Sequence, residues 1–346
     1  MIGKMKKIQK EYSLLEEAVK ELQKNLQTTY LDALIETLEN ILDNNQVHVE
    51  DDKPDKKTVA KLKELYADSN IKNLEADEKR QVIQLLILKS YSEDKIQANH
   101  QMTPDSIGMI VSYLIELFAD SKKVLTITDI CVGTGNLLTD IYNNLDKQNK
   151  NIQAYGIDND DTLLALASIS TQFQKQNIEL YHQDAIEELL IPKTDLVVGD
   201  LPVGYYPIDD KVSDYITKNN DGHSYAHYVL IEKSIRQLKE DGIGIFIVPR
   251  GIFEVKDSVK LLKYIQKVGY LQGLLNLPTE LFNDKQSMKS ILVVQKKGNK
   301  AKQAEEVLLG DFPSFKKQEE FKKFINEIVS WAKKNIYFNW FFVKKD

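Results

Sequence analysis

The sequence predicts an α/β protein in which a mostly parallel sheet is covered by helices and preceded by a unit made of helices alone. Apolar residues recur at helical spacing through roughly the first hundred positions. Beyond residue 103, short apolar runs alternate with segments of helical periodicity. This alternation is typical of a parallel sheet with helices on both faces. The runs expected to form strands are 124–130, 152–158, 178–184, 195–200, 243–249, 271–278 and 290–296.

Residues 1–98 are expected to form the helical domain. Their apolar spacing indicates one helix over 5–43 and two more over about 58–67 and 75–92. A polar segment that contains Pro54 separates the first helix from the second. Nothing in this domain points to chemistry. We therefore expect it to pack against the following domain or to mediate a homodimer.

Composition restricts the class of protein. Hydrophobic residues make up 42% and charged residues 28% of the chain, a balance that excludes disordered and collagen-like proteins. The only cysteine, Cys131, permits no internal disulfide, so the reducing cytoplasm is the expected location. Charged residues interrupt the start of the chain before any apolar signal region. The apolar run at 242–249 is far shorter than the roughly 20 residues that cross a membrane.

The net charge of −6 is unevenly distributed. A protein that binds nucleic acid over its whole surface would be basic overall, and this chain is not. Its end, residues 284–346, is nevertheless net positive. The lysines there could contact the phosphates of DNA or RNA, or could form a solvated face that protects an edge strand. They include Lys285, Lys289, Lys296, Lys297, Lys300 and Lys302.

The first strand of the α/β domain, residues 99–346, ends in a glycine-rich loop. Gly133 and Gly135 let the backbone turn sharply and approach a ligand, and the helix that begins after Asn136 directs its N–H groups towards the same point. A dinucleotide site would need a third glycine where Leu138 stands, which argues against an NAD-dependent dehydrogenase. Taken alone, the loop is also compatible with a tight turn that binds nothing.

Two further strand ends carry acidic residues. The second strand ends in Asp158, and a carboxylate there can accept both hydroxyls of a ribose. The third ends in Asp184, followed by Ala185, where an adenine amino group and ring could lie. Each aspartate alone is more often a helix cap than a ligand. Three consecutive strand ends of this kind, in this order, form a specific pattern.

The stretch from about 100 to 296 resembles the N6-adenine DNA methyltransferases, and most of all their stand-alone bacterial members of the YtxK type. The matching landmarks, in family order, are 100–104, 129–136, Asp158, Asp184, 200–204, 226–228 and 277–282. The resemblance implies a class I methyltransferase fold, with seven strands and the last antiparallel, and S-adenosylmethionine as the cofactor. The cofactor-binding residues that it implies are Thr103, Asp129, Cys131, Gly133, Gly135, Asn136, Asp158, Asn159, Asp184 and Ala185.

The resemblance also assigns the catalytic residues. The family carries Asn, Asp or Ser, then two prolines and an aromatic residue. In that chemistry a side-chain oxygen and a backbone carbonyl accept the hydrogens of an exocyclic amine, and the aromatic ring holds the flipped base. This chain has Asp200, Leu201, Pro202 and Val203. Both acceptors are retained, but Leu201 no longer fixes φ, and Val203 removes stacking worth roughly 1–3 kcal/mol.

Tyr205 and Tyr206 follow closely and could supply a substitute ring, although packing or loop anchoring is the slightly favoured interpretation of both. No large target-recognition segment is visible. After residue 300 there remain a strand-like run at 306–312, a helix near 317–335 and an aromatic tail. The leading prediction is methyl transfer to an amino group, nominally adenine in DNA or RNA, without a metal. The alternative is a module that binds S-adenosylmethionine for regulation and has lost catalysis.

Overall fold

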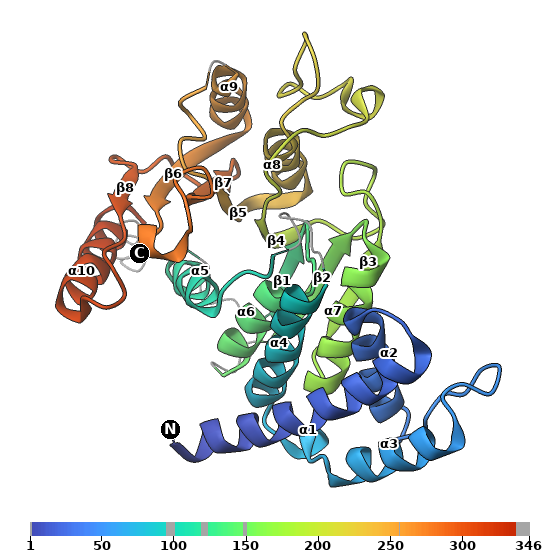
Figure 1. The fold of residues 1–346 in the computed structure, drawn as a ribbon. Helices are drawn as coiled ribbons and strands as arrows, with labels where there is room; N and C mark the ends of the chain where they lie inside the picture. The colour runs from blue at the N-terminus through green and yellow to red at the C-terminus, as the bar shows by residue number, and fades with distance from the viewer. Residues whose placement is uncertain (1, 95–100, 119–123, 148–150, 256, 337–346) are drawn as a thin grey trace.

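The computed structural model describes residues 2–94, 101–118, 124–147, 151–255 and 257–336. Helices alone make up the first part of the chain, as predicted (Figure 1). They are α1 (Ile2–Leu26), α2 (Tyr30–Leu42), α3 (Lys56–Asp68) and α4 (Ala76–Glu93). The expected domain boundary at 98/99, residue 100 and the aromatic tail beyond 336 lie outside the described residues.

The single helix expected over 5–43 is wrong, because the chain turns between α1 and α2. Gln27 adopts a positive φ of 56°, which ends α1. Thr29 then caps α2, and its side chain accepts a hydrogen bond from the backbone N–H of Asp32. Both helices bury an apolar face, so the apolar spacing continues across the turn and does not reveal it.

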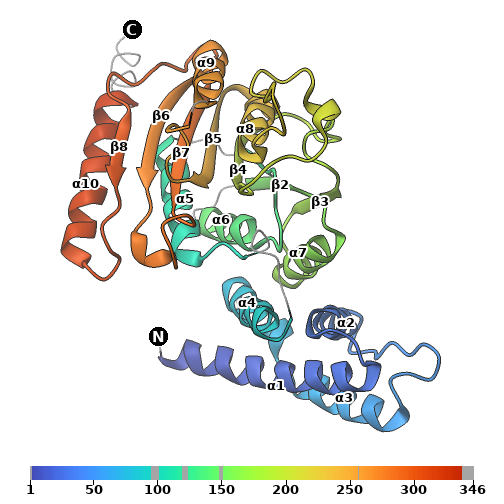
Figure 2. The same ribbon diagram turned by 45° about the horizontal axis from the view of Figure 1, so that its top comes forward.

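The helical unit shares a hydrophobic cluster with α7 (Asp161–Gln174), a helix of the sheet domain. Leu166, Ile169 and Phe173 of α7 are buried among side chains of the first four helices. Helix α4 lies between α1 and the sheet domain, beside α7 and α6 (Asn136–Asp146) (Figure 2). The helical unit therefore packs against α6 and α7, the helices that follow the first two strands.

One eight-stranded sheet forms the centre of the rest of the chain, in the order β3-β2-β1-β4-β5-β7-β6-β8. Strand β7 is antiparallel to both of its neighbours, whereas β8 pairs parallel with β6. The expectation of seven strands with the last antiparallel is thus corrected, because the run after residue 306 buries Leu308 and joins the edge as an eighth strand. The bounds are β1 (Val124–Asp129), β2 (Asn151–Asp158), β3 (Ile178–His182), β4 (Thr194–Asp200), β5 (Leu238–Pro249), β6 (Gly269–Asn276), β7 (Lys289–Lys296) and β8 (Leu308–Asp311).

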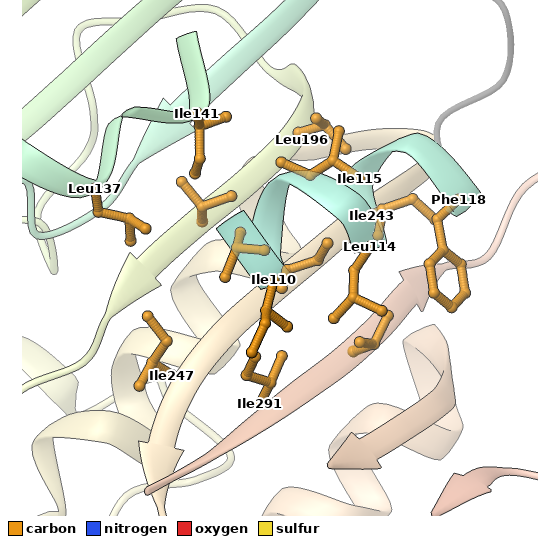
Figure 3. Packing of buried hydrophobic residues seen from close by; sticks show 14 of the residues in the cluster. Ile110, Leu114, Ile115, Phe118, Leu137, Ile141, Leu196, Ile243, Ile247 and Ile291 are labelled. Atoms are coloured by element: carbon orange, nitrogen blue, oxygen red, sulfur yellow. The ribbon is translucent and has the colours of Figure 1, made fainter. Parts of the chain in front are cut away.

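Helices cover both faces of this sheet. Helices α5 (Asp105–Phe118), α6 and α7 lie on one face, and α8 (Ala226–Gln237) and α9 (Ser258–Val268) lie on the other (Figure 2). Ile110 and Leu114 of α5 pack against side chains of the central strands, including Ile291 of β7 (Figure 3). Helix α10 (Gln318–Asn335) lies beside β8. Short 3-10 helices occur at Ile71–Asn73, Asp209–Val212 and Thr279–Leu281.

The strand order places a ligand site at one edge of the sheet. Strand β1 is followed along the chain by β2 on one side and, later, by β4 on the other, so the order reverses at β1. Polar residues at the carboxyl ends of these strands meet there. No helix within the described ranges is long and apolar enough to cross a membrane.

Candidate cofactor and catalytic site

A cavity of about 1120 Å³ opens at the carboxyl ends of the parallel strands. Residues 101–104, which lead into α5, line it together with the ends of β1, β2 and β4 and with residues 281–284, 286 and 287 before β7. Every site residue predicted from the sequence lines this cavity except Asp129 and Gly135. The topology therefore brings together residues that lie about a hundred positions apart in the chain.

The loop between β1 and α6 turns on two glycines with positive φ. Gly133 has a φ of 52° and Gly135 a φ of 80°, conformations that cost glycine little. Gly135 is the N-cap of α6, and a Cβ there would lie 3.1 Å from the Cβ of Ala167. A Cβ at Gly133 would meet no atom within 4 Å. Gly135 thus permits close packing of α6 on α7, whereas Gly133 leaves open space for a ligand.

Asp158 presents a paired acceptor to the cavity. Its Oδ2 accepts the backbone N–H of Gly133 at 2.7 Å, and its Oδ1 accepts that of Asp160 at 3.0 Å. Burial raises the pKa of Asp158, and these hydrogen bonds oppose the effect. A carboxylate oxygen has two lone pairs, so one acceptor position remains on each oxygen. This arrangement fits two adjacent hydroxyls of a ribose.

Asp129 and Cys131 support the loop from inside the protein. Asp129 is 1% exposed, and its Oδ1 accepts the backbone N–H of Cys131 at 3.2 Å. Burial raises the pKa of Asp129 to about 8, and the charges of Asp158 and Asp200 add to the effect. The Cys131 thiol donates to the backbone carbonyl of Asp200 at 3.3 Å, and burial raises its pKa. The thiol therefore joins the cofactor loop to the catalytic segment.

A tyrosine and a lysine hold Asp184, which follows β3. The Tyr206 hydroxyl donates to Asp184 Oδ2 at 2.6 Å, and Lys211 Nζ lies 3.1 Å from the same oxygen. Asp184 Oδ1 accepts the backbone N–H of Ile186 at 3.0 Å. Tyr206 is 9% exposed. These contacts support the loop-anchoring interpretation of Tyr206.

Both carboxylate oxygens of Asp200, the last residue of β4, are engaged. Oδ2 accepts the Thr103 hydroxyl at 2.9 Å, and Oδ1 lies 2.5 Å from Nζ of Lys289. The Asp200 and Lys289 side chains are only 17% and 24% exposed. The interpretation of Lys289 as a surface lysine is therefore wrong, because β7 runs antiparallel and brings its first residue to the catalytic edge. Sequence reasoning missed this partner.

Two more lysines of the basic end are bound to backbone carbonyls of their own chain. Lys296 Nζ donates to Leu238 at 2.6 Å, and Lys297 Nζ donates to Gln266 at 2.7 Å. Lys285, Lys300 and Lys302 are exposed. Lys296 is thus partly withdrawn from the surface, whereas Lys297 remains exposed and keeps its charge there.

The segment after Asp200 is fixed from two sides. Leu201 is buried, and its N–H donates to the carbonyl of Ile247 at 3.0 Å. The imidazole of His227 hydrogen-bonds the backbone of Pro202, and burial lowers the pKa of His227 to about 4, so this ring is neutral. These contacts replace part of the rigidity that a proline at Leu201 would give.

Tyr205 lies at the mouth of the cavity. Val203, at the family's aromatic position, is 44% exposed, and Tyr205 is 59% exposed. The Tyr205 ring is stacked on that of Tyr225, with centroids 4.9 Å apart and planes 23° apart. Tyr225 covers one face of the Tyr205 ring, and a second planar group can stack on the other face.

The fold and the site together define a class I S-adenosylmethionine-dependent methyltransferase. The described residues fit this cofactor, because Asp158 offers a double acceptor and Gly133 leaves open space beside it. The chain belongs to the N-6 DNA Methylase family, which it matches over residues 85–336. Residues 9–91 match the YtxK N-terminal helical domain.

Known proteins resemble nearly the whole chain. It is 37% identical over 325 residues to the uncharacterized protein YtxK of Bacillus subtilis, covering 93% of this chain and 97% of that one. A Listeria monocytogenes structure, described as a candidate class I S-adenosylmethionine-dependent methyltransferase, is 36% identical with a TM-score of 0.88, covering 95% and 99% of the chains. The methyltransferase subunit of a Streptococcus thermophilus type I restriction-modification system shares the fold at 18% identity, with a TM-score of 0.66 and coverage of 92% and 74%.

Proposed function

We propose that this protein transfers a methyl group to an exocyclic amino group, nominally adenine N6 in nucleic acid. The observation that carries the proposal is the position of Asp200. Its carboxylate lines the cavity at the end of β4, beside the cofactor loop, and the backbone of Leu201 follows directly. The Asp200 carboxylate, whose oxygens already accept from Thr103 and Lys289, and the Leu201 backbone carbonyl are thus neighbouring acceptors for one amine.

The main contribution of the protein to this reaction is to position the amine and the methyl group relative to each other. S-adenosylmethionine, when bound, supplies an electrophilic methyl group. The Asp200 carboxylate and the Leu201 carbonyl accept hydrogen bonds from the two N–H groups of the amine, which directs its lone pair towards that methyl group. Thr103 holds the Asp200 carboxylate at 2.9 Å, and Cys131 holds its carbonyl at 3.3 Å. After transfer, the amine releases one proton to the carboxylate or to water.

Tyr205 is the substitute for the missing aromatic residue in this proposal. Tyr206 is bound to Asp184, whereas Tyr205 lines the cavity and is exposed on one face. Stacking on Tyr205 would restore part of the roughly 1–3 kcal/mol that an aromatic contact provides. Sequence preference should be weak, because the described residues form the helical unit and the sheet domain and no separate segment that would deliver side chains to base edges. Contact with phosphates should depend on salt, through lysines such as Lys285 and Lys300.

The test is transfer of a labelled methyl group to DNA and to RNA by the full chain, by Asp200→Ala and by Tyr205→Ala. We expect slow transfer to adenine, a loss of at least tenfold in Tyr205→Ala and no transfer in Asp200→Ala. Modified adenines are then mapped in the genomes of a deletion strain and its parent. A single sharply defined, fully methylated motif would contradict weak sequence preference.

One observation favours the second candidate, a regulatory module that binds the cofactor without catalysis. Lys289 already donates to the acceptor that an incoming amine would need. Binding of S-adenosylmethionine with no transfer to any nucleic acid, in the wild type and in Lys289 variants alike, would support this candidate over the first.

A further inference from the structure

A side chain of the helical unit reaches the catalytic edge. Arg80 of α4 is 3% exposed. Its guanidinium donates to both carboxylate oxygens of Asp105, at 2.8 and 3.0 Å, and to the side-chain oxygen of Asn136 at 3.0 Å. It also donates to Asp77 of its own helix at 3.0 Å. One planar group thus contacts α4, the first residue of α5 and the first residue of α6 at once.

Both distant contacts lead into the cofactor site. Asp105 directly follows residues 101–104, the segment that lines the cavity. Asn136 follows Gly135, and its amide donates to the backbone carbonyl of Thr103 at 2.7 Å. The Thr103 hydroxyl in turn donates to Asp200 at 2.9 Å. A continuous chain of hydrogen bonds therefore runs from Arg80 through Asn136 and Thr103 to Asp200.

Both ends of the Asn136 side chain are engaged by the protein itself in this arrangement. Its oxygen accepts from Arg80, and its nitrogen donates to Thr103 and, at 3.4 Å, to Asp105. Asn136 thus ties the start of α6 to the segment before α5. Asn136 itself belongs to the sheet domain, whereas Arg80, which holds it, belongs to the helical unit.

We propose that Arg80 is a positioning residue for the cofactor site. It sets the spacing between residues 103–105 and the start of α6, the two sides between which the cofactor binds. The helical unit is therefore part of the methyltransferase site and acts on it through Arg80, while Gln84 of the same helix also donates to Asp105 at 2.7 Å. This role concerns cofactor binding and does not depend on which amine accepts the methyl group.

The charges explain why arginine is needed. Asp77, Asp105 and Asp140 all lie within ion-pair distance of the one guanidinium, with Asp140 at 3.4 Å. A lysine would keep one positive charge, but it is a point donor without the planar fork that reaches several oxygens in fixed directions. Arg80→Lys therefore separates the geometric role from the charge. Arg80→Gln leaves Asp105 and Asp140 without this cation, whereas Asp77 keeps Lys4 at 2.9 Å, and the change risks unfolding.

The test uses the full chain and measures the Kd for S-adenosylmethionine and the thermal midpoint. Arg80→Lys and Asn136→Ala should each raise Kd at least tenfold while both proteins remain folded. Arg236→Lys is the matched control: Arg236 of α8 also binds two carboxylates, Asp214 and Glu232, but lies on the other face of the sheet. Arg236→Lys should leave Kd within twofold.

A double variant separates positioning from general destabilisation. If Arg80 acts through Asn136, Arg80→Lys combined with Asn136→Ala should raise Kd little more than either change alone. Fold-changes that multiply would show independent effects and overturn the proposed route. A Kd within twofold of wild type in Arg80→Lys would overturn the role itself. Absent binding in the wild type would instead refute the cofactor assignment.

Discussion

The ammonium group of Lys289 lies 2.5 Å from Oδ1 of Asp200, so an amine of the protein itself occupies an acceptor at the proposed catalytic position. The two residues are 89 positions apart and meet because β7 is inserted antiparallel between β5 and β6. An incoming amine must share this oxygen or displace the lysine. The ion pair is therefore a direct point of control over the site.

Replacement of Lys289 should show whether this lysine blocks the Asp200 acceptor or assists catalysis. Lys289→Met removes the competing donor, and we expect methyl transfer to DNA or RNA to rise several-fold. Lys289→Gln removes the charge but keeps a donor, so its transfer rate should lie between those of the wild type and Lys289→Met. Both changes leave a half-buried carboxylate without its charged partner, at a cost of about 1.5–3 kcal/mol in stability. A lower transfer rate in both folded variants would show that Lys289 assists catalysis.

The Asp158 carboxylate should dominate recognition of the cofactor's ribose. We expect Asp158→Ala to weaken binding of S-adenosylmethionine by more than about 1.5 kcal/mol, since hydrogen bonds to a charged acceptor are lost. Isothermal titration measures this effect directly. Asp161→Ala is the control, because Asp161 is exposed in the first turn of α7 and does not line the cavity. Undiminished binding in Asp158→Ala would refute the role given to that residue.

The buried Asp129 predicts a pH dependence of stability in the cofactor-free protein. Its pKa in the folded state is about 8, well above the ordinary value of 3.8. The unfolded chain therefore loses this proton first, and folding stability should fall as pH rises from about 4 to about 8, by up to about 1.4 kcal/mol per pH unit. Asp129→Asn removes this contribution, so its thermal midpoint should decline less over that range.

The control for Asp129 is Asp68→Asn, since Asp68 is exposed at the end of α3. Burial also raises the pKa of Asp158, which gives the wild type a further slope of the same sign. The difference between the wild-type and Asp129→Asn curves isolates Asp129. Parallel curves between pH 4 and 8 would show that Asp129 carries no raised pKa.

The two glycines of the cofactor loop should respond differently to alanine. Gly133→Ala adds only the cost of a positive φ, about 1–2 kcal/mol, but places a methyl group in open space beside the cavity. We expect it to reduce cofactor affinity at least tenfold. Gly135→Ala adds a close contact with Ala167 to the same backbone cost, so its larger effect should be on the thermal midpoint. Equal effects of both variants on both measurements would contradict this division.

These residues show which parts of the site the sequence could predict. Gly133, Asp158 and Asp184 stand where a strand meets a loop, so a local pattern identifies each of them. The family order then placed Asp200. Lys289 and Arg80 carry no such local signal, because their partners lie 89 and 56 positions away and are set by strand order and helix packing. The turn after α1 does carry a local signal, the Thr29 cap of α2, and the run at 306–312 is strand-like in sequence, but its pairing with β6 is decided by tertiary contacts.

Cys131 provides the last prediction, that its thiol has a structural role. It donates to the Asp200 carbonyl at 3.3 Å, and a Cβ at Gly199 would lie 3.0 Å from its sulfur, so the side chain fills space between β1 and β4. Burial raises the thiol pKa, and the thiolate that reacts with alkylating reagents is correspondingly scarce. We expect Cys131→Ala to bind S-adenosylmethionine within about threefold of wild type, because one small apolar group replaces another at this partly buried position. Its stability should drop by about 0.5–1.5 kcal/mol for the lost hydrogen bond. Mass spectrometry after treatment with iodoacetamide gives an independent measurement, in which the folded, cofactor-bound protein should be labelled far more slowly than the denatured chain. Rapid labelling of the bound protein would mean that the thiol is accessible and ionised, and the link between the cofactor loop and Asp200 would then have to be abandoned.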